Sequence, residues 1–276
     1  MQVKYTDNGV YLENVENFDL AATLDCGQAF RWEPLADGSW QGIVGSKQLT
    51  LRRDKGGILL CGANDKDYLS LWKDYFDLDR DYGAVIKEIS ADERLAKAAA
   101  AGGGIRILRQ QPWETLCSFI ISQNNNIPRI KGIISRLCSL FGEKCGTGYT
   151  FPSAERIAAC SETELAPLRA GFRAGYILDA ARKVSSGEID LASLSSLPMD
   201  AARERLMTIR GVGPKVADCT LLFGLGFIQA FPQDVWIKRV MAESFDGHLP
   251  DCALPYAGIA QQYLFYSARE NKCNIA

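Results

Sequence analysis

Lys215 and Asp234 are the residues whose types and positions best suit covalent chemistry. Lys215 lies in the first turn of a helix that Pro214 is expected to begin. The positive end of the helix dipole and any burial disfavour a charged amine there, so the neutral, nucleophilic form is favoured. Asp234 follows nineteen residues later and offers a carboxylate that could stabilise positive charge developing on a substrate. The alternative for Asp234 is a purely structural role as the N-cap of the next helix.

The turn before Lys215 has the features of a phosphate-binding hairpin. Gly211, Val212 and Gly213 separate a helix that ends near Ile209 from the helix that begins at Pro214. Two glycines permit a tight turn that brings bare backbone close to a ligand. The unpaired N–H groups and the dipole at the start of the new helix suit a phosphate. A helix–glycine–helix corner with only a packing role would leave the same pattern, and the Lys that follows favours the functional interpretation.

Five segments, in order, resemble those of the 8-oxoguanine DNA glycosylase/lyases, a branch of the helix-hairpin-helix/Gly-Pro-Asp superfamily of DNA glycosylases. They are Gly-Gln-Ala-Phe-Arg-Trp at 27–32, Ser-Gln-Asn-Asn-Asn-Ile-Pro-Arg-Ile at 122–130, Gly-Phe-Arg-Ala-Gly-Tyr at 171–176, the hairpin with Lys215, Pro232 and Asp234, and Tyr-Ala-Gly-Ile-Ala-Gln-Gln-Tyr-Leu-Phe at 256–265. The chain departs from the branch at Ala29 (Ser), Phe172 (Tyr), Trp236 (His in many members) and Ala268 (Asp in many members). The last two departures predict that one small polar contact is missing.

The resemblance implies a bifunctional DNA glycosylase/AP lyase of base-excision repair. Such an enzyme flips 8-oxoguanine out of double-stranded DNA, preferably opposite cytosine. Lys215 would attack C1′ of the sugar, expel the base and form a Schiff base, and β-elimination would then cut the strand 3′ to the lesion. Asp234 would support the charge and the proton transfers. Two alternatives remain open: a monofunctional alkylated-base glycosylase, which would lack the Lys, and a non-catalytic helix-hairpin-helix DNA-binding module.

The same resemblance assigns Gly27, Cys219, Gln261 and Phe265 to the pocket for the flipped base. Phe265 offers an aromatic face, Cys219 a polarisable one, and Gln261 both a donor and an acceptor for the Watson–Crick edge. 8-Oxoguanine carries a hydrogen on N7 that guanine lacks, and the carbonyl of Gly27 could accept it. The alternative for Cys219 and Phe265 is an ordinary place in the helix core.

Asn124, Arg129, Arg173 and Phe172 resemble the residues that fill the vacated space and hold the partner base. A cytosine left unpaired presents N3 and O2 as acceptors, which the donors of an arginine suit. The alternatives are an exposed Asn at a helix break and two arginines that are solvated or touch only phosphates.

No metal cluster or organic cofactor is expected. Cys138 and Cys145 have the spacing that opens the iron–sulfur loop of endonuclease III relatives, but they precede the hairpin and no second closely spaced pair follows. His248 is the only histidine, so a zinc site is not expected. The resemblance allows a loosely held monovalent cation at the hairpin carbonyls. Nine irregularly spaced cysteines, an odd number, predict reduced thiols without disulfides.

The elements that must position these residues change in character along the chain. Short apolar runs at 10–12, 30–32, 41–44, 49–51 and 58–60 predict strands, with a hairpin at 54–57. Helices are predicted at 113–123, 128–141, 153–160, 161–169, 173–185, 200–209, 214–223, 234–244 and 255–271. One further helix is predicted from a stripe of six residues: Tyr68, Leu69, Leu71, Trp72, Tyr75 and Phe76.

This order of elements predicts an α+β protein. Residues 1–104 would form a small antiparallel sheet subdomain, which the resemblance makes TATA-binding-protein-like. Residues 105–276 would form a mostly helical domain with its helix-hairpin-helix motif at about 203–224. The glycines at 102–104 either end the first subdomain or cap a helix.

Charge and composition agree with a DNA-binding enzyme only in part. The net charge of −2 is unusual for such a protein, but residues 1–100 carry 12 basic and 17 acidic residues, and residues 101–276 carry 19 and 16. The apolar run at 219–231 has 13 residues and a membrane span needs about 20, so no membrane partner is expected. No secretory signal is evident. We expect a monomer, cytoplasmic and nucleoid-associated in a prokaryote or nuclear in a eukaryote.

Overall fold

The computed structural model describes residues 1–270, so Cys273 and the predicted helix end at Asn271 lie outside the described part. Contacts group the chain into two compact units that are not contiguous in sequence. Unit 1 contains Met1–Gln41, Leu49–Arg109 and the chain from Ile228 onward, and unit 2 contains Gly42–Gln48 and Gln110–Phe227. The domain boundary after residue 104 stays a prediction, and the last helix, α15 (Ala257–Glu270), falls in unit 1 together with most of the N-terminal strands.

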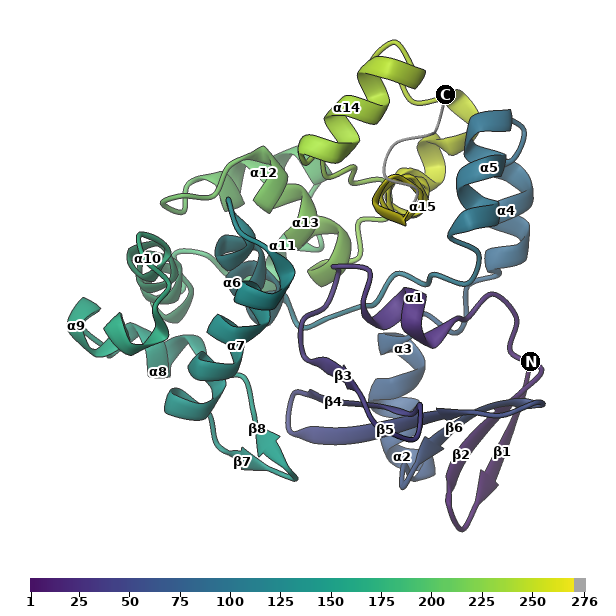
Figure 1. Ribbon diagram of the computed structural model, residues 1–276. Coiled ribbons are helices and arrows are strands. Elements are labelled where there is room, and N and C mark those ends of the chain that lie inside the picture. Colours follow the sequence, from purple (N-terminus) through teal and green to yellow (C-terminus); the bar gives the residue numbers. More distant parts are fainter. Residues whose placement is uncertain (271–276) are drawn as a thin grey trace. The chain divides into compact units, whose positions relative to one another are not determined.

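A six-stranded antiparallel sheet forms the N-terminal part, in the order β1-β2-β6-β5-β4-β3 (Figure 1). Four of the five predicted strands and the hairpin at 54–57 are confirmed. The fifth is displaced, because Phe30 is buried in a loop and the strand begins only at Trp32. The strands are β1 (Gln2–Thr6), β2 (Gly9–Glu13), β3 (Trp32–Pro34), β4 (Trp40–Val44), β5 (Lys47–Arg53) and β6 (Gly57–Cys61).

Helices and an aromatic cluster complete unit 1. Trp32 and Tyr75 are buried together, and the indole N–H of Trp32 donates to the Tyr75 hydroxyl at 2.8 Å. The predicted stripe is wrong for Leu69, which is 62% exposed, because Tyr68–Trp72 winds as a wider π-helical turn that shifts the helical phase. The remaining helices are α1 (Leu20–Leu24), α2 (Asp65–Asp67), α3 (Lys73–Tyr75), α4 (Tyr82–Ile89), α5 (Glu93–Ala101) and α14 (Val235–Ser244).

Unit 2 is helical apart from a short hairpin and the segment Gly42–Gln48, which holds the turn between β4 and β5 (Figure 1). The predicted helices are confirmed to within a few residues, and the α+β class with them. The structure adds α11 (Leu191–Leu194) and the strands β7 (Lys144–Cys145) and β8 (Gly148–Tyr149), which are too short to leave a periodic pattern. The main helices are α6 (Pro112–Ser122), α7 (Ile127–Phe141), α8 (Ala154–Ala158), α9 (Glu162–Leu165), α10 (Arg173–Ser185), α12 (Met199–Met207) and α13 (Pro214–Gly224).

Within residues 1–270, no helix is long and apolar enough to cross a membrane. The same residues contain no group of three or more His, Cys, Asp or Glu side chains placed to hold a metal ion. None of the eight cysteines within residues 1–270 forms a disulfide.

Candidate active site

The hairpin between α12 and α13 has the geometry that its two glycines predict. Gly211 has a φ of +81°, and a Cβ there would lie 2.1 Å from the ring of Tyr176, so no larger residue fits. Gly213 caps α13 in an extended conformation, and Pro214 is the first residue of the helix. A Cβ on Gly213 would meet no atom within 4 Å, so the backbone there is open to a ligand. Gly211 thus serves packing, whereas Gly213 lies where a phosphate could approach.

Neighbouring side chains hold the hairpin in place. The carboxylate of Asp179 on α10 accepts a hydrogen bond from the backbone N–H of Arg210 at 2.8 Å. Lys183, one turn later, donates to the carbonyl of Thr208 at 2.6 Å. Val212, between the two glycines, is buried. Helix α10 therefore fixes the loop that precedes Lys215.

Lys215 lies against the end of helix α6. Its Nζ donates a hydrogen bond to Oγ of Ser122 at 3.1 Å and lies 4.9 Å from the ring centroid of Phe119. Ser122 Oγ in turn donates to the carbonyl of Phe119 at 2.8 Å. The ring of Phe119 stacks on Phe223 with 5.4 Å between centroids. The amine is thus held by one hydroxyl and one aromatic face, neither of which the sequence analysis assigned to it.

Asp234 is the N-cap of α14, as the structural alternative predicted. Its Oδ1 accepts from the backbone N–H of Ile237 at 2.8 Å. The cap fixes the carboxylate at the start of the helix, where Val235 and Trp236 are exposed to 82% and 44%. Trp236 and Ala268 both depart from the family pattern, and Ala268 is buried in α15. A cap and a catalytic carboxylate are compatible roles, because the cap bond uses one oxygen only.

Three of the four predicted base-pocket residues lie in unit 1, and Cys219 lies buried on α13 in unit 2. Gly27 has a φ of +93°, a conformation that glycine adopts readily. Gln261 and Phe265 lie one turn apart on α15, the first buried and the second half-buried.

A chain of hydrogen bonds sets the orientation of the Gln261 amide. The Nε2 of Gln262 donates to Oε1 of Gln261 at 2.8 Å, and the thiol of Cys26 donates to Gln262 at 3.3 Å. Burial raises the pKa of Cys26 to about 11, so the thiol keeps the proton that it donates. Because its carbonyl is engaged, Gln261 retains its NH₂ group as the side available to a ligand.

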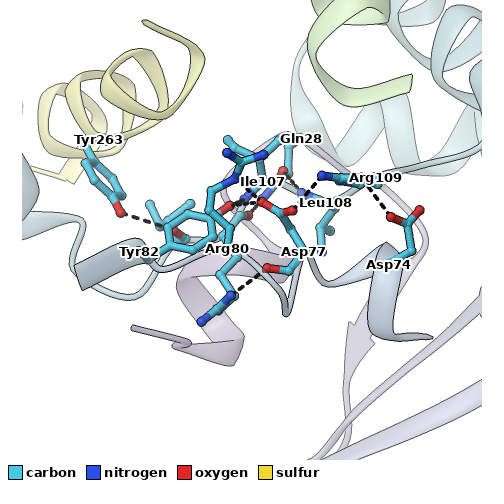
Figure 2. A network of polar contacts seen from close by, with 11 residues as sticks. Gln28, Asp74, Asp77, Arg80, Tyr82, Ile107, Leu108, Arg109 and Tyr263 are labelled. Carbon is cyan, nitrogen blue, oxygen red and sulfur yellow. Dashed lines mark hydrogen bonds and ion pairs between the residues drawn. The ribbon is translucent and has the colours of Figure 1, made fainter. Parts of the chain in front are cut away.

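The loop that carries Gly27 is anchored by Gln28, whose side chain is fully buried. Its Nε2 donates to the carbonyls of Arg106 and Thr23 at 2.8 and 2.9 Å, and its Oε1 accepts from the N–H of Leu108 at 2.9 Å. Figure 2 shows the Gln28 side chain beside Ile107 and Leu108 of the segment 105–109. Gln28 lies within the Gly-Gln-Ala-Phe-Arg-Trp segment, and nothing in the sequence alone predicts this anchoring role.

The far side of the same segment is held by a buried tyrosine. The hydroxyl of Tyr82 accepts from the N–H of Ile107 at 2.8 Å and donates to Asp77 at 3.0 Å (Figure 2). Burial raises the pKa of Tyr82 well above its ordinary value, so the hydroxyl stays protonated. Arg109 reaches the same Asp77 at 3.0 Å. The loop of Gly27 is therefore fixed to a buried polar network.

The residues predicted to meet the partner base gather in unit 2. Asn124 lies exposed at the break between α6 and α7 with a φ of +46°, and Arg129 is exposed in the first turn of α7. Phe172 is 55% exposed at the start of α10, and its ring lies 4.4 Å from the guanidinium of Arg173. It also makes an edge contact with Tyr176 at 5.5 Å.

Arg173 is not the solvated arginine of the structural alternative, because it is only 2% exposed. Its guanidinium makes four hydrogen bonds, two to the carbonyl of Gln123 and one each to the carbonyls of Asn124 and Ala170. Burial and, secondly, the charge of Arg129 lower the pKa of Arg173. Arg173 therefore holds the strained Asn124 loop, and Arg129 is the better placed of the two for direct contact with DNA.

Comparison with known proteins gives this arrangement a family. Residues 10–116 match the model of the 8-oxoguanine DNA glycosylase N-terminal domain, and residues 117–247 match the helix-hairpin-helix/Gly-Pro-Asp superfamily of base-excision DNA repair proteins. An N-glycosylase/DNA lyase of Saccharomyces cerevisiae is 36% identical over 84% of this chain and 69% of its own length. The Arabidopsis thaliana N-glycosylase/DNA lyase OGG1 is 31% identical over 85% and 67%.

Among solved structures, the Clostridium acetobutylicum 8-oxoguanine glycosylase/lyase, in complex with double-stranded DNA containing cytosine opposite 8-oxoguanine, superimposes with a TM-score of 0.92. It is 37% identical, and the match covers 99% of both chains. The chain therefore belongs to the 8-oxoguanine DNA glycosylase/lyase family, within the helix-hairpin-helix/Gly-Pro-Asp superfamily of base-excision repair proteins.

Proposed function

We propose that this enzyme excises 8-oxoguanine from double-stranded DNA through a Schiff base on Lys215 and then cleaves the strand 3′ to the abasic site. The observation that carries the proposal is the position of the Lys215 amine at the start of α13. Ser122 and Phe119 hold this amine, and it lies beside a glycine hairpin whose backbone is open to a phosphate. Relatives of the chain are named N-glycosylase/DNA lyase, and a lyase of this kind needs such an amine.

The reaction follows from the chemistry of the assigned side chains. The neutral amine of Lys215 attacks C1′ of the flipped nucleotide, and the bond from C1′ to the base breaks with its electron pair leaving on the base. Ring opening gives a protonated Schiff base, and loss of a proton from C2′ expels the 3′ phosphate by β-elimination. Asp234 stabilises the positive charge that develops at C1′. Gly27, Cys219, Gln261 and Phe265 hold the base, and no organic cofactor takes part.

A nicking assay tests the proposal against the two alternatives. The enzyme should release base and cut the strand on a duplex with 8-oxoguanine opposite cytosine, and should leave the same duplex with guanine intact. A monofunctional alkylated-base glycosylase would release alkylated bases without cutting, and a DNA-binding module would do neither. Failure to cut the 8-oxoguanine duplex would contradict the proposal.

Truncation of the base pocket should impair base release selectively. Phe265→Ala removes an aromatic face, and stacking of one base on an aromatic side chain is worth about 1–3 kcal/mol, so single-turnover excision should fall by roughly five- to 150-fold. Gln261→Ala removes the remaining amide donor and should slow excision comparably. Cleavage of a duplex that already contains an abasic site needs no base pocket and should proceed at nearly the wild-type rate.

Thermal melting serves as the control for these variants, because Gln261 is buried and Phe265 is half-buried on α15. A variant that melts like the wild type and still excises 8-oxoguanine at full rate would remove that residue from the pocket.

Arg129 should set the preference for cytosine opposite the lesion. An orphaned cytosine presents two acceptors to the guanidinium, whereas adenine presents an amino donor that the guanidinium cannot satisfy, at a cost of about 1–3 kcal/mol. Arg129→Ala should therefore slow excision most when cytosine is opposite the lesion. The differences among the excision rates for the four partner bases should become smaller. The measurement is the excision rate on duplexes with C, A, G or T opposite 8-oxoguanine.

Lys131→Ala, on the same helix, provides the matched control and should leave the preference unchanged. If Arg129→Ala lowers the rate equally on all four duplexes and weakens the salt dependence of binding, Arg129 contacts phosphate only. Arg173→Ala is expected to act differently, because its guanidinium supports the Asn124 loop and its loss should lower the melting temperature as well.

A further inference from the structure

We propose that Ser122 is a positioning residue for the catalytic amine: it holds Nζ of Lys215 as a donor only and so keeps the nitrogen lone pair free for attack. The inference rests on the proposed role of Lys215 as nucleophile. It concerns the end of helix α6, where the side chains of Ser122 and Phe119 meet Lys215 within unit 2.

The hydrogen-bond geometry at Ser122 leaves one arrangement of protons. A serine hydroxyl has a single hydrogen to donate. That hydrogen is directed to the carbonyl of Phe119 at 2.8 Å, a backbone acceptor three residues earlier in the same helix. Towards Lys215, Oγ can therefore only accept, and the 3.1 Å contact must use an N–H of the amine.

The ring of Phe119 occupies a second direction around the amine. Nζ lies 4.9 Å from the ring centroid, and the face of an aromatic ring attracts an N–H but not a lone pair. Phe119 itself is buried and stacked on Phe223 with an angle of 17° between the rings, so packing holds the ring in place. A neutral amine has two N–H bonds and one lone pair. With one N–H on Ser122 and the other over Phe119, the lone pair points away from both.

The orientation of the lone pair predicts that loss of Ser122 and loss of a base-pocket residue affect different steps of the reaction. The same amine attacks C1′ during base release and attacks the aldehyde of an abasic site that is already formed. Misorientation of the lone pair should therefore slow both reactions together, because a misplacement of about 1 Å can cost about a hundredfold in rate. A pocket residue should affect base release alone.

The experiment compares Ser122→Ala with Ser122→Thr and with Ser139→Ala. Ser122→Ala removes the acceptor and should lower kcat about ten- to a hundredfold, with KM unchanged, on both the 8-oxoguanine duplex and a preformed abasic duplex. Ser122→Thr keeps a hydroxyl that can bond the same backbone carbonyl and should recover most of the rate. Ser139 on α7 makes the matching bond to the carbonyl of Arg136 at 3.1 Å, and Ser139→Ala should leave both rates unchanged.

Three results would overturn the inference in a protein whose wild-type form is active: full activity of Ser122→Ala on either substrate, a loss confined to base release, or failure of Ser122→Thr to recover activity while it melts like the wild type. Inactivity of the wild type on both duplexes would instead overturn the proposed function, and the inference with it.

Discussion

Lys215→Gln is expected to abolish borohydride cross-linking and strand cleavage while it leaves binding to DNA largely intact. An amide nitrogen cannot form a Schiff base, so the rate should fall by at least about a thousandfold, as it does when other enzymes lose their nucleophile. Glutamine retains N–H donors, on a side chain one bond shorter than that of lysine. Contacts to phosphate dominate affinity for DNA, so binding measured by fluorescence anisotropy should change little.

Lys87→Gln is the control, since Lys87 is exposed on α4 in the other unit and should behave like the wild type in all three assays. Efficient cross-linking by Lys215→Gln would show that another amine is the nucleophile. A loss of binding equal to the loss of activity would make Lys215 a phosphate contact.

Asp234→Asn should produce the second largest effect. The substitution removes the negative charge of the side chain and keeps its role as the N-cap of α14. Asparagine caps helices about as well as aspartate, so the bond to the N–H of Ile237 and the melting temperature should survive. Loss of the negative charge near C1′ should slow base release by about a hundred- to a thousandfold. The measurements are single-turnover excision of 8-oxoguanine and thermal unfolding of the same preparation.

Asp234→Ala completes this test. It removes both charge and cap, so its activity should match that of Asp234→Asn while its stability falls by about 1 kcal/mol more. Should Asp234→Asn excise 8-oxoguanine at the wild-type rate, the carboxylate would be a structural N-cap and nothing else.

The hairpin and its flanking helices could be predicted from the sequence because their signals are local. Gly211 needs a positive φ, Pro214 starts a helix, and both effects act on the backbone of neighbouring residues. The same holds for α10, predicted with the bounds that it has. The roles of the site residues are predicted from resemblance and from the chemistry of their side chains.

The partners of the site residues could not be predicted, because they depend on tertiary contacts. Ser122 is 93 positions from Lys215 in the sequence. Phe119 is an apolar residue in a helix, and its sequence context does not show whether its ring contacts an amine or only packs in the core. The burial of Arg173 could not be predicted either. An arginine is normally exposed, so the sequence could not show that this one is buried on three backbone carbonyls.

Two of the four departures from the family pattern, Trp236 and Ala268, lie in contrasting environments. Ala268 is only 3% exposed, and a carboxylate at such a position would require a partner. With Trp236 in place of the usual His, the first turn of α14 presents an exposed aromatic ring beside Asp234. At position 268, an alanine in place of the usual Asp avoids an unpaired charge in the interior.

The most direct test of the central claim is to trap the wild-type enzyme with borohydride on a duplex that carries 8-oxoguanine opposite cytosine, and to identify the modified peptide by mass spectrometry. We predict one covalent adduct, on the peptide that contains Lys215, formed with release of 8-oxoguanine and absent from the guanine duplex. Base release without any adduct, or an adduct on a different lysine, would contradict the account.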